Sequence, residues 1–585
     1  MSGELRLPFS ARVSRASDLA AISAVFERAR SEEWATRLAD KDVTLWTRDA
    51  EVQAKIANRL GWLDAPVHFT EQVPALEAFG EKVRDAGFTT AIVAGMGGSS
   101  LAPEVLATAF ASISEWLKIR VCDSTDPEAV AAALAGLNPA KTLVIVASKS
   151  GTTTETLSFA AYAAGWISSA LSAGEDPFAS MIAISDPSPS IDGIPGNERM
   201  LERFLNPADI GGRYSALSFV GLVPASLLGI DLDSLLAAGA VAAAQLREPE
   251  PTANRAVALG VIIGALAREG RDKLTLLVDE PIHGFGAWAE QLVAESTGKQ
   301  GVGVVPVDLE PLGTLESYQD DRLFVRIALN GGRAPRAADG TSADTRLNEL
   351  AAAGHPVISY TLSDAIDLGG EFLHWEAATA IAGVVLGINP FDEPNVTESK
   401  QNTTAVLGEL AATDALPELT PKCADGKLQL WVDGALPAAF ADDAVKLVAG
   451  QLQRLAQRGY IGIHAYIATT PERTAALTSL RLLLRDATHR ATTVGYGPRF
   501  LHSTGQLHKG GAPIGWFIQL VAGRPHDLEI PGSSFTFGQL VDAQALGDAR
   551  SLVAHDLPIL RIHLGSNPDA GLVAVESLFR RALSA

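Results

Sequence analysis

Short, continuously apolar runs that end at glycine or hydroxyl residues place the strongest constraint on how this chain folds. Thr90–Ala94, Thr142–Ala147 and Met181–Ile184 are β-rich throughout, and each precedes a polar or Gly-rich turn and an Ala-rich helical segment. Strands that are apolar on both faces are typical of parallel sheets covered by helices on both sides. The first part of the chain is therefore predicted to form a doubly wound α/β domain.

The same alternation returns after the Pro-rich break at Glu248–Pro251. Further strand-like runs are Lys273–Val278, Leu323–Leu329, Pro356–Leu362, Leu428–Val432, Ile461–Ile467, Trp516–Val521 and Ile559–Leu564. We predict an N-terminal helical segment (residues 1–75), two α/β domains (76–247 and 252–412) and a C-terminal α/β segment (420–585). The C-terminal segment is expected to pack on the second domain or to complete it.

The amino-acid composition limits the kinds of molecule that the protein is expected to bind. The chain has 585 residues, of which 47% are hydrophobic, enough to bury large cores. Lys plus Arg number 47 and Asp plus Glu 68, a net charge of −21, which disfavours binding to nucleic acid or anionic membranes. Two cysteines are too few for a disulfide framework or a zinc site. Without a membrane-length apolar stretch or a signal-peptide core, a cytoplasmic protein is expected.

Two loops at strand ends carry the first chemical signal. Gly95–Ser100 (GMGGSS) lets the backbone approach a ligand, although it could equally be a tight structural turn. Ser148–Thr156 (SKSGTTTET) packs six hydroxyls, one amine and one glycine into nine residues at the start of a helix. One hydroxyl suffices to cap a helix, so this loop is predicted to bind a phosphate group. The Walker pattern is absent, which argues against nucleoside triphosphate hydrolysis.

Three further motifs carry charged side chains. Arg213 follows two glycines in a loop, a context that favours an anionic target. Gln291 and Glu295 share one face of a predicted helix, where an isolated glutamate is more often a surface residue than a base. Lys400 is placed in the first turn of a helix, where it would oppose the helix dipole, and this slightly favours a functional role.

A histidine-rich segment lies late in the chain, at Phe500–Gly511. His502 and His508 are six residues apart without a nearby carboxylate, so a metal site is not predicted.

Taken in order, these motifs resemble the phosphoglucose isomerase family. GMGGSSLAPEV is similar to its GxGGSxLGP loop, SKSGTTTET to SK[ST]xTTxET, GGRYSALSFVGL to GGRYSxxSxxGL, QLVAESTGK to Q…MESxGK and NPFDEPNVTESK to NxFDQxGVExxK. The resemblance runs from about residue 60 to 405. It is nearest to the isomerase part of bacterial transaldolase–isomerase fusions, where stretches like RFLHSTGQLHKGG also occur, although residues 1–60 are too short for a transaldolase barrel.

The resemblance implies two doubly wound domains of the sugar-isomerase (SIS) type and interconversion of glucose 6-phosphate and fructose 6-phosphate. It also implies a role for each motif residue. Glu295 would move a proton between C2 and C1, Arg213 would stabilise the enediolate, and Lys400 would assist at the ring oxygen. The substrate-binding residues would be Gly98, Ser99, Ser148, Lys149, Ser150, Thr153, Thr156 and Gln291. No metal or organic cofactor is implied, and a homodimer is one implication of the family.

The family's ring-opening histidine is out of place in this sequence. Between Glu295 and Lys400 only His355 and His374 occur, and neither has the family's local context. His502 does have it, with a glutamine four residues later and a glycine after eight. We therefore expect the histidine segment to have moved past the lysine motif.

Other functions remain open at this level. A related isomerase could act on mannose phosphate or an amino-sugar phosphate, and a sensor could bind a sugar phosphate without catalysis. An amidotransferase is disfavoured because no N-terminal cysteine nucleophile is present. A sensor would have no use for Glu295, Arg213 and Lys400 together. The sequence sets neither the epimer preference nor the oligomeric state.

Overall fold

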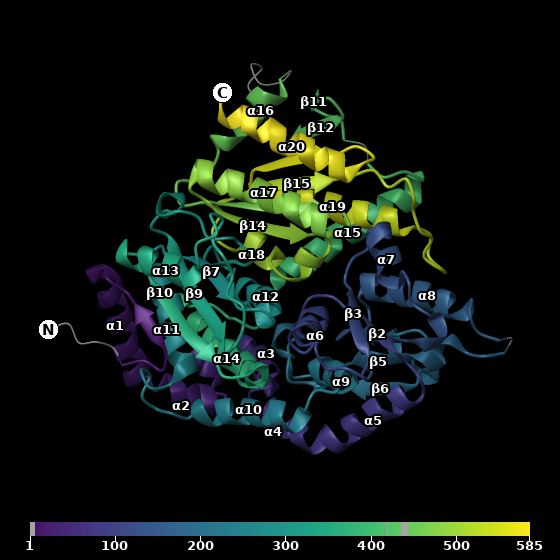
Figure 1. Cartoon of the computed structure of the whole chain (residues 1–585), viewed down its shortest axis with the longest axis horizontal. Coiled ribbons are helices and arrows are strands. Elements are labelled where there is room, and N and C mark those ends of the chain that lie inside the picture. The colour runs from purple at the N-terminus through teal and green to yellow at the C-terminus, as the bar shows by residue number, and fades with distance from the viewer. Residues whose placement is uncertain (1–5, 173, 418, 434–442) are drawn as a thin grey trace.

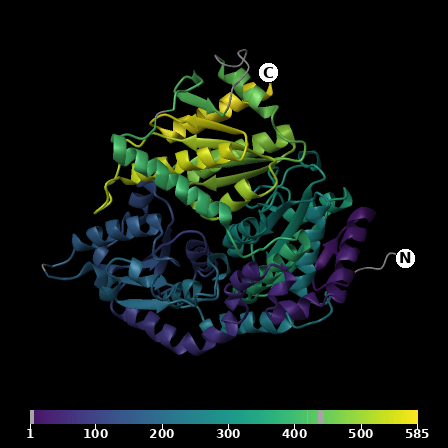
Figure 2. The same ribbon diagram turned by 180° about the vertical axis from the view of Figure 1, so that it is seen from behind.

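Three lobes, each built around one β-sheet, make up the computed structural model of the chain (Figure 1). The structure describes residues 6–172, 174–417, 419–433 and 443–585. In Figure 1 the C-terminal lobe lies above the other two, which sit side by side. Figure 2 shows the same arrangement from behind.

The first sheet has the order β3-β2-β4-β5-β6, and all its strands run parallel. Its strands are β2 (Thr90–Ala94), β3 (Lys118–Cys122), β4 (Thr142–Ala147), β5 (Met181–Ser185) and β6 (Glu202–Leu205). Its helices are α6 (Gly98–Ala109), α7 (Pro127–Leu134), α8 (Thr154–Ser168), α9 (Phe219–Leu228) and α10 (Leu232–Gln245). Along β2, Ala91 and Val93 join one hydrophobic cluster, whereas Ile92 and Ala94 join another that includes α7 and α8. Helices therefore cover both faces, and the predicted doubly wound α/β class is confirmed.

The second sheet has the order β1-β10-β9-β7-β8 and is parallel except for β1. Its strands are β1 (Ser10–Arg12), β7 (Lys273–Val278), β8 (Val305–Val307), β9 (Arg322–Leu329) and β10 (Val357–Leu362). Its helices are α11 (Arg255–Arg268), α12 (Phe285–Thr297), α13 (Ala343–Ala352) and α14 (Leu368–Leu386).

The N-terminal segment is helical, as expected, apart from β1, which adds an antiparallel edge to the second sheet. Its helices are α1 (Ala16–Ser31), α2 (Trp34–Ala39), α3 (Ala50–Ala57), α4 (Ala65–His68) and α5 (Val73–Asp85). Helix α1 packs on α11 and α5 packs on α9, so the segment spans both lobes.

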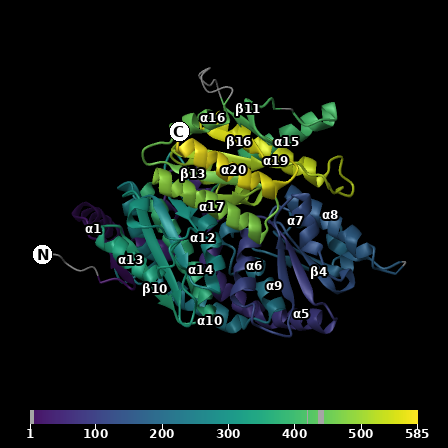
Figure 3. The same cartoon turned by 45° about the horizontal axis from the view of Figure 1, so that its top comes forward.

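The C-terminal segment forms a third sheet of its own, in the order β11-β12-β16-β15-β13-β14. Its strands are β11 (Cys423–Asp425), β12 (Leu428–Val432), β13 (Tyr460–Tyr466), β14 (Ala491–Tyr496), β15 (Gly515–Val521) and β16 (Ile559–His563). Its helices are α15 (Pro394–Thr413), α16 (Ala444–Leu452), α17 (Pro471–Thr488), α18 (Gly505–Gly510), α19 (Phe537–Ala554) and α20 (Pro568–Leu583). Helices α17 and α20 cover the face that is turned forward in Figure 3.

The third lobe packs on the second lobe and adds no strand to its sheet. One buried cluster joins Ala294 and Val305 of the second lobe to Tyr460, Leu507 and Phe517 of the third. Helix α15 packs on α19, so residues 394–413 lie with the third lobe although they follow the second in sequence.

All ten predicted strand-like runs are strands, and every one lies inside a sheet. The six strands that the apolar pattern missed, β1, β3, β6, β8, β11 and β14, are the six edge strands. Among the described helices, none combines the length and the apolar character that crossing a membrane would require.

Candidate functional site

The hydroxyl-rich loop joins β4 to α8 at the carboxyl edge of the first sheet. Gly151 has φ +67°, and a Cβ there would lie 1.7 Å from the carbonyl oxygen of Ser190, so only glycine fits. Thr153 precedes the helix without capping it, and its hydroxyl instead lies 3.0 Å from the Ser148 hydroxyl. The first N–H groups of α8 thus have no side-chain cap and are available to a ligand beside the paired hydroxyls, as an anion site requires.

Lys149 of this loop is already paired. Its ammonium donates to Asp186 at 2.6 Å and to the carbonyl oxygen of Ala208 at 3.0 Å. The loop therefore offers hydroxyls and N–H groups, while the charge of Lys149 is largely neutralised.

The Gly-rich loop after β2 lies against the loop that carries Arg213. A Cβ on Gly98 would come within 1.9 Å of the carbonyl oxygen of Gly212, and Gly97 has φ +57°. These glycines let two backbones approach closely beside Ser99, which lines the cavity described below.

Arg213 is buried where the lobes meet, with 4% of its surface exposed. Its guanidinium contacts the Ser296 hydroxyl (2.8 Å), Glu393 (3.0 Å), Glu295 (3.4 Å) and the carbonyl oxygens of Pro390 (2.7 Å) and Asp392 (3.0 Å). Burial opposes its charge, but the two carboxylates outweigh burial and raise the pKa of Arg213. The guanidinium stays charged and faces the cavity.

Helix α12 places Gln291 and Glu295 one turn apart, as predicted. The Gln291 amide donates to Glu295 at 3.0 Å and to the backbone carbonyl of His502 at 2.8 Å. Burial raises the pKa of Glu295, the charge of Arg213 lowers it and the charge of Glu393 raises it, with a net increase. A buried carboxyl with a raised pKa is suited to accepting and returning a proton.

His502 reaches the cavity from the third lobe. Its Nε2 lies 2.9 Å from Oε1 of Glu155, which sits in the first turn of α8. Burial raises the pKa of Glu155, but the charge and hydrogen bond of His502, with a further contribution from Lys400, lower it overall. Gln544 of α19 donates to the same Glu155 oxygen at 2.7 Å. The carboxylate therefore fixes the orientation of the imidazole.

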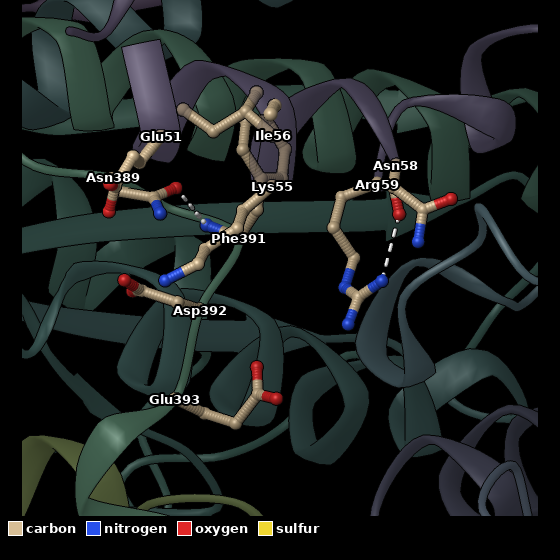
Figure 4. Close-up of a pocket in the computed structure, with 10 residues that line it drawn as sticks. Glu51, Lys55, Ile56, Asn58, Arg59, Asn389, Phe391, Asp392 and Glu393 are labelled. Carbon is tan, nitrogen blue, oxygen red and sulfur yellow. Dashed lines mark hydrogen bonds between the residues drawn. The ribbon is translucent and has the colours of Figure 1, made fainter. Parts of the chain in front are cut away.

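One cavity of about 380 Å³ unites these side chains. Of the twelve residues predicted for the site, eleven line it: Gly98, Ser99, Ser148, Lys149, Ser150, Thr153, Arg213, Gln291, Glu295, Lys400 and His502. A second pocket of about 600 Å³ adjoins it through Arg59 and Glu393, and Figure 4 shows its lining.

Three details differ from the sequence-based expectations. Thr156 lies within α8, buried, with its hydroxyl unpartnered, and it does not line the cavity. Lys400 sits in the second turn of α15, because the helix begins at Pro394, so the argument from a first-turn lysine is wrong. His355 and His374 are buried away from the cavity, and burial lowers their pKa values to about 4 and about 3.

Sequence reasoning missed Glu155, Glu393, Arg59, Asp186 and Gln544. Glu155 received no role from the sequence, because nothing local indicates a partner 347 residues away. Glu393 stands where the family pattern has glutamine. The sequence FDEPN shows this difference, but it did not suggest a role for Glu393. Among the described residues, no group of three or more His, Cys, Asp or Glu side chains could hold a metal ion.

A hydroxyl-rich loop at the carboxyl edge of a parallel sheet, a buried arginine and a glutamate with a raised pKa thus meet where open α/β sheets bind their ligands. The sequence profile of the phosphoglucose isomerase family matches residues 40–306. The chain is 27% identical to a glucose-6-phosphate isomerase of Rubrobacter xylanophilus over 381 residues, covering 58% of this chain and 87% of that protein. It is 29% identical to the glucose-6-phosphate isomerase of Lactobacillus delbrueckii subsp. bulgaricus over 405 residues, covering 62% and 90%.

A solved glucose-6-phosphate isomerase from Chlamydia trachomatis superposes with a TM-score of 0.55 at 20% identity, over 70% of this chain and 90% of the other, and supports the fold. The resemblance predicted from the motifs is confirmed for residues 40–306, which match the profile of the phosphoglucose isomerase family. That match ends before Lys400 and His502, so the later part of the site rests on the structure described above.

Because Glu295 and Glu393 both contact Arg213, a change at Glu393 should alter the pKa of Glu295. Glu393→Gln removes a negative charge next to Glu295, so the pKa of Glu295 should fall toward its ordinary value. The measurement is a 13C titration of glutamate-labelled protein, with the Glu295 signal assigned by its absence in Glu295→Gln. Glu398→Gln, one turn further along α15, should leave that titration unchanged, since Glu398 bonds to Ser551 and His555. An unchanged or higher pKa in Glu393→Gln would contradict the electrostatic assignment.

Proposed function

We propose that the chain interconverts glucose 6-phosphate and fructose 6-phosphate by ring opening and proton transfer through an enediolate. The observation that carries the proposal is the convergence of Glu295, Arg213 and His502, one from each lobe, on a cavity that also contains the hydroxyl loop. Aldose–ketose isomerisation needs a phosphate anchor, a ring-opening acid, a carbon-proton base and stabilisation of an oxyanion. Each has one candidate here.

Substrate binding comes first in this mechanism. The N–H groups at the start of α8 and the hydroxyls of Ser148, Ser150 and Thr153 would hold the phosphate. His502, oriented by Glu155, would then donate a proton to the ring oxygen as the C1–O5 bond breaks, while the C1 hydroxyl gives its proton to water and becomes the aldehyde oxygen. Lys400, exposed at the cavity wall, would assist at that oxygen.

Proton transfer follows in the open chain. Glu295 would take the proton from C2, and the electron pair of that C–H bond would form the C1–C2 double bond of the enediolate. Arg213 faces the cavity beside Glu295 and would stabilise the negative oxygen. The C2 hydroxyl would pass its proton to the negative oxygen on C1, and Glu295 would return the carbon-bound proton to C1, which leaves a hydroxyl at C1 and a ketone at C2. No step calls for a cofactor.

Several finer statements belong with this proposal. A cytoplasmic location and a homodimer, the latter implied by the family, remain proposals. Activity on mannose phosphate or an amino-sugar phosphate, and a sensor role, are the alternatives that the assays below separate.

The first test removes the base. Glu295→Gln keeps the shape of the side chain but cannot accept a carbon-bound proton, so kcat should fall by about 10²–10⁴-fold with little change in inhibitor affinity. The measurement is production of glucose 6-phosphate from fructose 6-phosphate, coupled to glucose-6-phosphate dehydrogenase, together with solvent tritium exchange into the substrate.

Glu290→Gln is the matched control. Glu290 precedes Gln291 on α12, lines a different cavity and has a pKa that burial raises to about 8. Its amide variant should retain near wild-type turnover. Unchanged exchange in Glu295→Gln would remove Glu295 from the base role.

A second test addresses ring opening. A ring-opening acid matters only for the cyclic substrate, so His502→Ala should slow conversion of the cyclic sugar phosphate by about 100-fold or more. Proton exchange on an open-chain analogue should change far less. His374→Ala and His355→Ala should behave like wild type, because both histidines lie outside the cavity. A defect in His374→Ala that His502→Ala lacks would overturn the assignment.

A further inference from the structure

The proposed phosphate loop lacks an available positive charge of its own. Lys149, its only cation, is paired with Asp186 and with a backbone carbonyl. A phosphate monoester carries up to two negative charges, and hydroxyls and N–H groups alone leave that charge uncompensated. Binding of a phosphate group at this loop therefore calls for a second positively charged side chain nearby.

Arg59 is such a cation, and it comes from the N-terminal segment. It follows the C-terminus of α3 and lines the catalytic cavity together with Ser148, Lys149 and Ser150. Its guanidinium makes one hydrogen bond, to the carbonyl oxygen of Asn58 at 2.8 Å. Figure 4 shows this single dashed contact to Asn58. Within the described part of the chain, no carboxylate forms an ion pair with it.

Two further observations indicate that Arg59 lies near the hydroxyl loop. Its Cδ passes 3.7 Å from the position that a Cβ on Gly211 would take, beside the glycines that precede Arg213. Burial raises the pKa of Asp186, and the neighbouring charges of Lys149 and then Arg59 oppose that rise. The guanidinium therefore lies near the Lys149–Asp186 pair, at the edge of the hydroxyl loop.

We infer that Arg59 supplies the positive charge that binds the substrate's phosphate group, an assignment that rests on the function proposed above. Guanidinium is planar and offers paired N–H donors that match two phosphate oxygens. Half-buried and free of a carboxylate partner, it can turn toward the phosphate without breaking an ion pair. The inference gives the N-terminal segment a role in the site that its sequence did not indicate.

Lys55 provides the matched comparison. It lies on α3, one turn before Arg59, and lines the adjoining pocket but not the catalytic cavity. In Figure 4 its ammonium points toward Asp392, away from Arg59. Substitution of either residue by glutamine removes one positive charge from the same helix end. A difference in phosphate binding between the two variants therefore reflects the position of the charge and not the net charge.

The test measures anion binding directly. Arg59→Gln should raise the dissociation constants of inorganic phosphate and 6-phosphogluconate by about tenfold or more, with gluconate, which has no phosphate, unaffected. KM for fructose 6-phosphate should rise in parallel, with kcat within about threefold, because the phosphate does not react. Arg59→Lys should recover part of the affinity, and Lys55→Gln should stay within about twofold of wild type.

The possible failures can be told apart. Equal phosphate affinity in Arg59→Gln and wild type would overturn the inference while leaving isomerisation untouched, and so would an equal loss in Lys55→Gln. A wild-type chain that fails to isomerise but binds phosphate in an Arg59-dependent way would overturn the proposed function and leave the anion site standing. Matching far-ultraviolet circular dichroism of the variants checks that folding is intact.

Discussion

The buried guanidinium of Arg213 is the interaction on which the rest of the site depends. A charge taken out of water destabilises the fold unless every donor finds a partner. Arg213 belongs to the first lobe, whereas the groups that accept its hydrogen bonds lie on α12 or on the loop before α15. The arginine can be satisfied only when the lobes are docked, so the fold that buries it also assembles the catalytic cavity.

The sharing of Arg213 bears directly on Glu295, the proposed base. A carboxylate held alone against a buried guanidinium would be locked in its ionised form, with a low pKa and little tendency to take a proton. Here Glu393 makes the shorter contact, 3.0 Å against 3.4 Å for Glu295. Burial, supported by the negative charge of Glu393, outweighs the charge of Arg213 and raises the pKa of Glu295, which also accepts a hydrogen bond from Gln291. Glutamate at position 393, where the family pattern has glutamine, thus bears directly on how this site works.

The third lobe contributes His502 and also fixes it in place. Gln291 holds the backbone carbonyl of His502, and Arg499, in the same short helix, pairs with Asp123 of the first lobe at 3.1 Å. Glu155 orients the imidazole from α8. The histidine is therefore anchored to both of the other lobes, which explains how a segment placed after Lys400 in sequence reaches the same cavity.

The sequence predicted the inner strands of each sheet and most residues that line the cavity. It did not predict features that depend on contacts between distant segments. The strands that carry a continuous apolar pattern are covered on both faces, whereas edge strands such as β3 and β6 are partly exposed and lose that signal. Glycine and hydroxyl patterns located the anion loop, because backbone approach and free N–H groups are local properties. The pairing of Glu155 with His502 and the position of Arg59 depend on how distant segments dock, which no spacing in the sequence encodes.

The most direct measurement is a nuclear magnetic resonance assay of the purified chain with fructose 6-phosphate in D2O. The account predicts that glucose 6-phosphate accumulates without any added cofactor and that deuterium enters at C2 over many turnovers. A carboxylate that carries the proton between C1 and C2 exchanges part of it with solvent. Absence of glucose 6-phosphate, or conversion with no deuterium at C2, would contradict the proposal that this cavity isomerises a sugar phosphate through an enediolate.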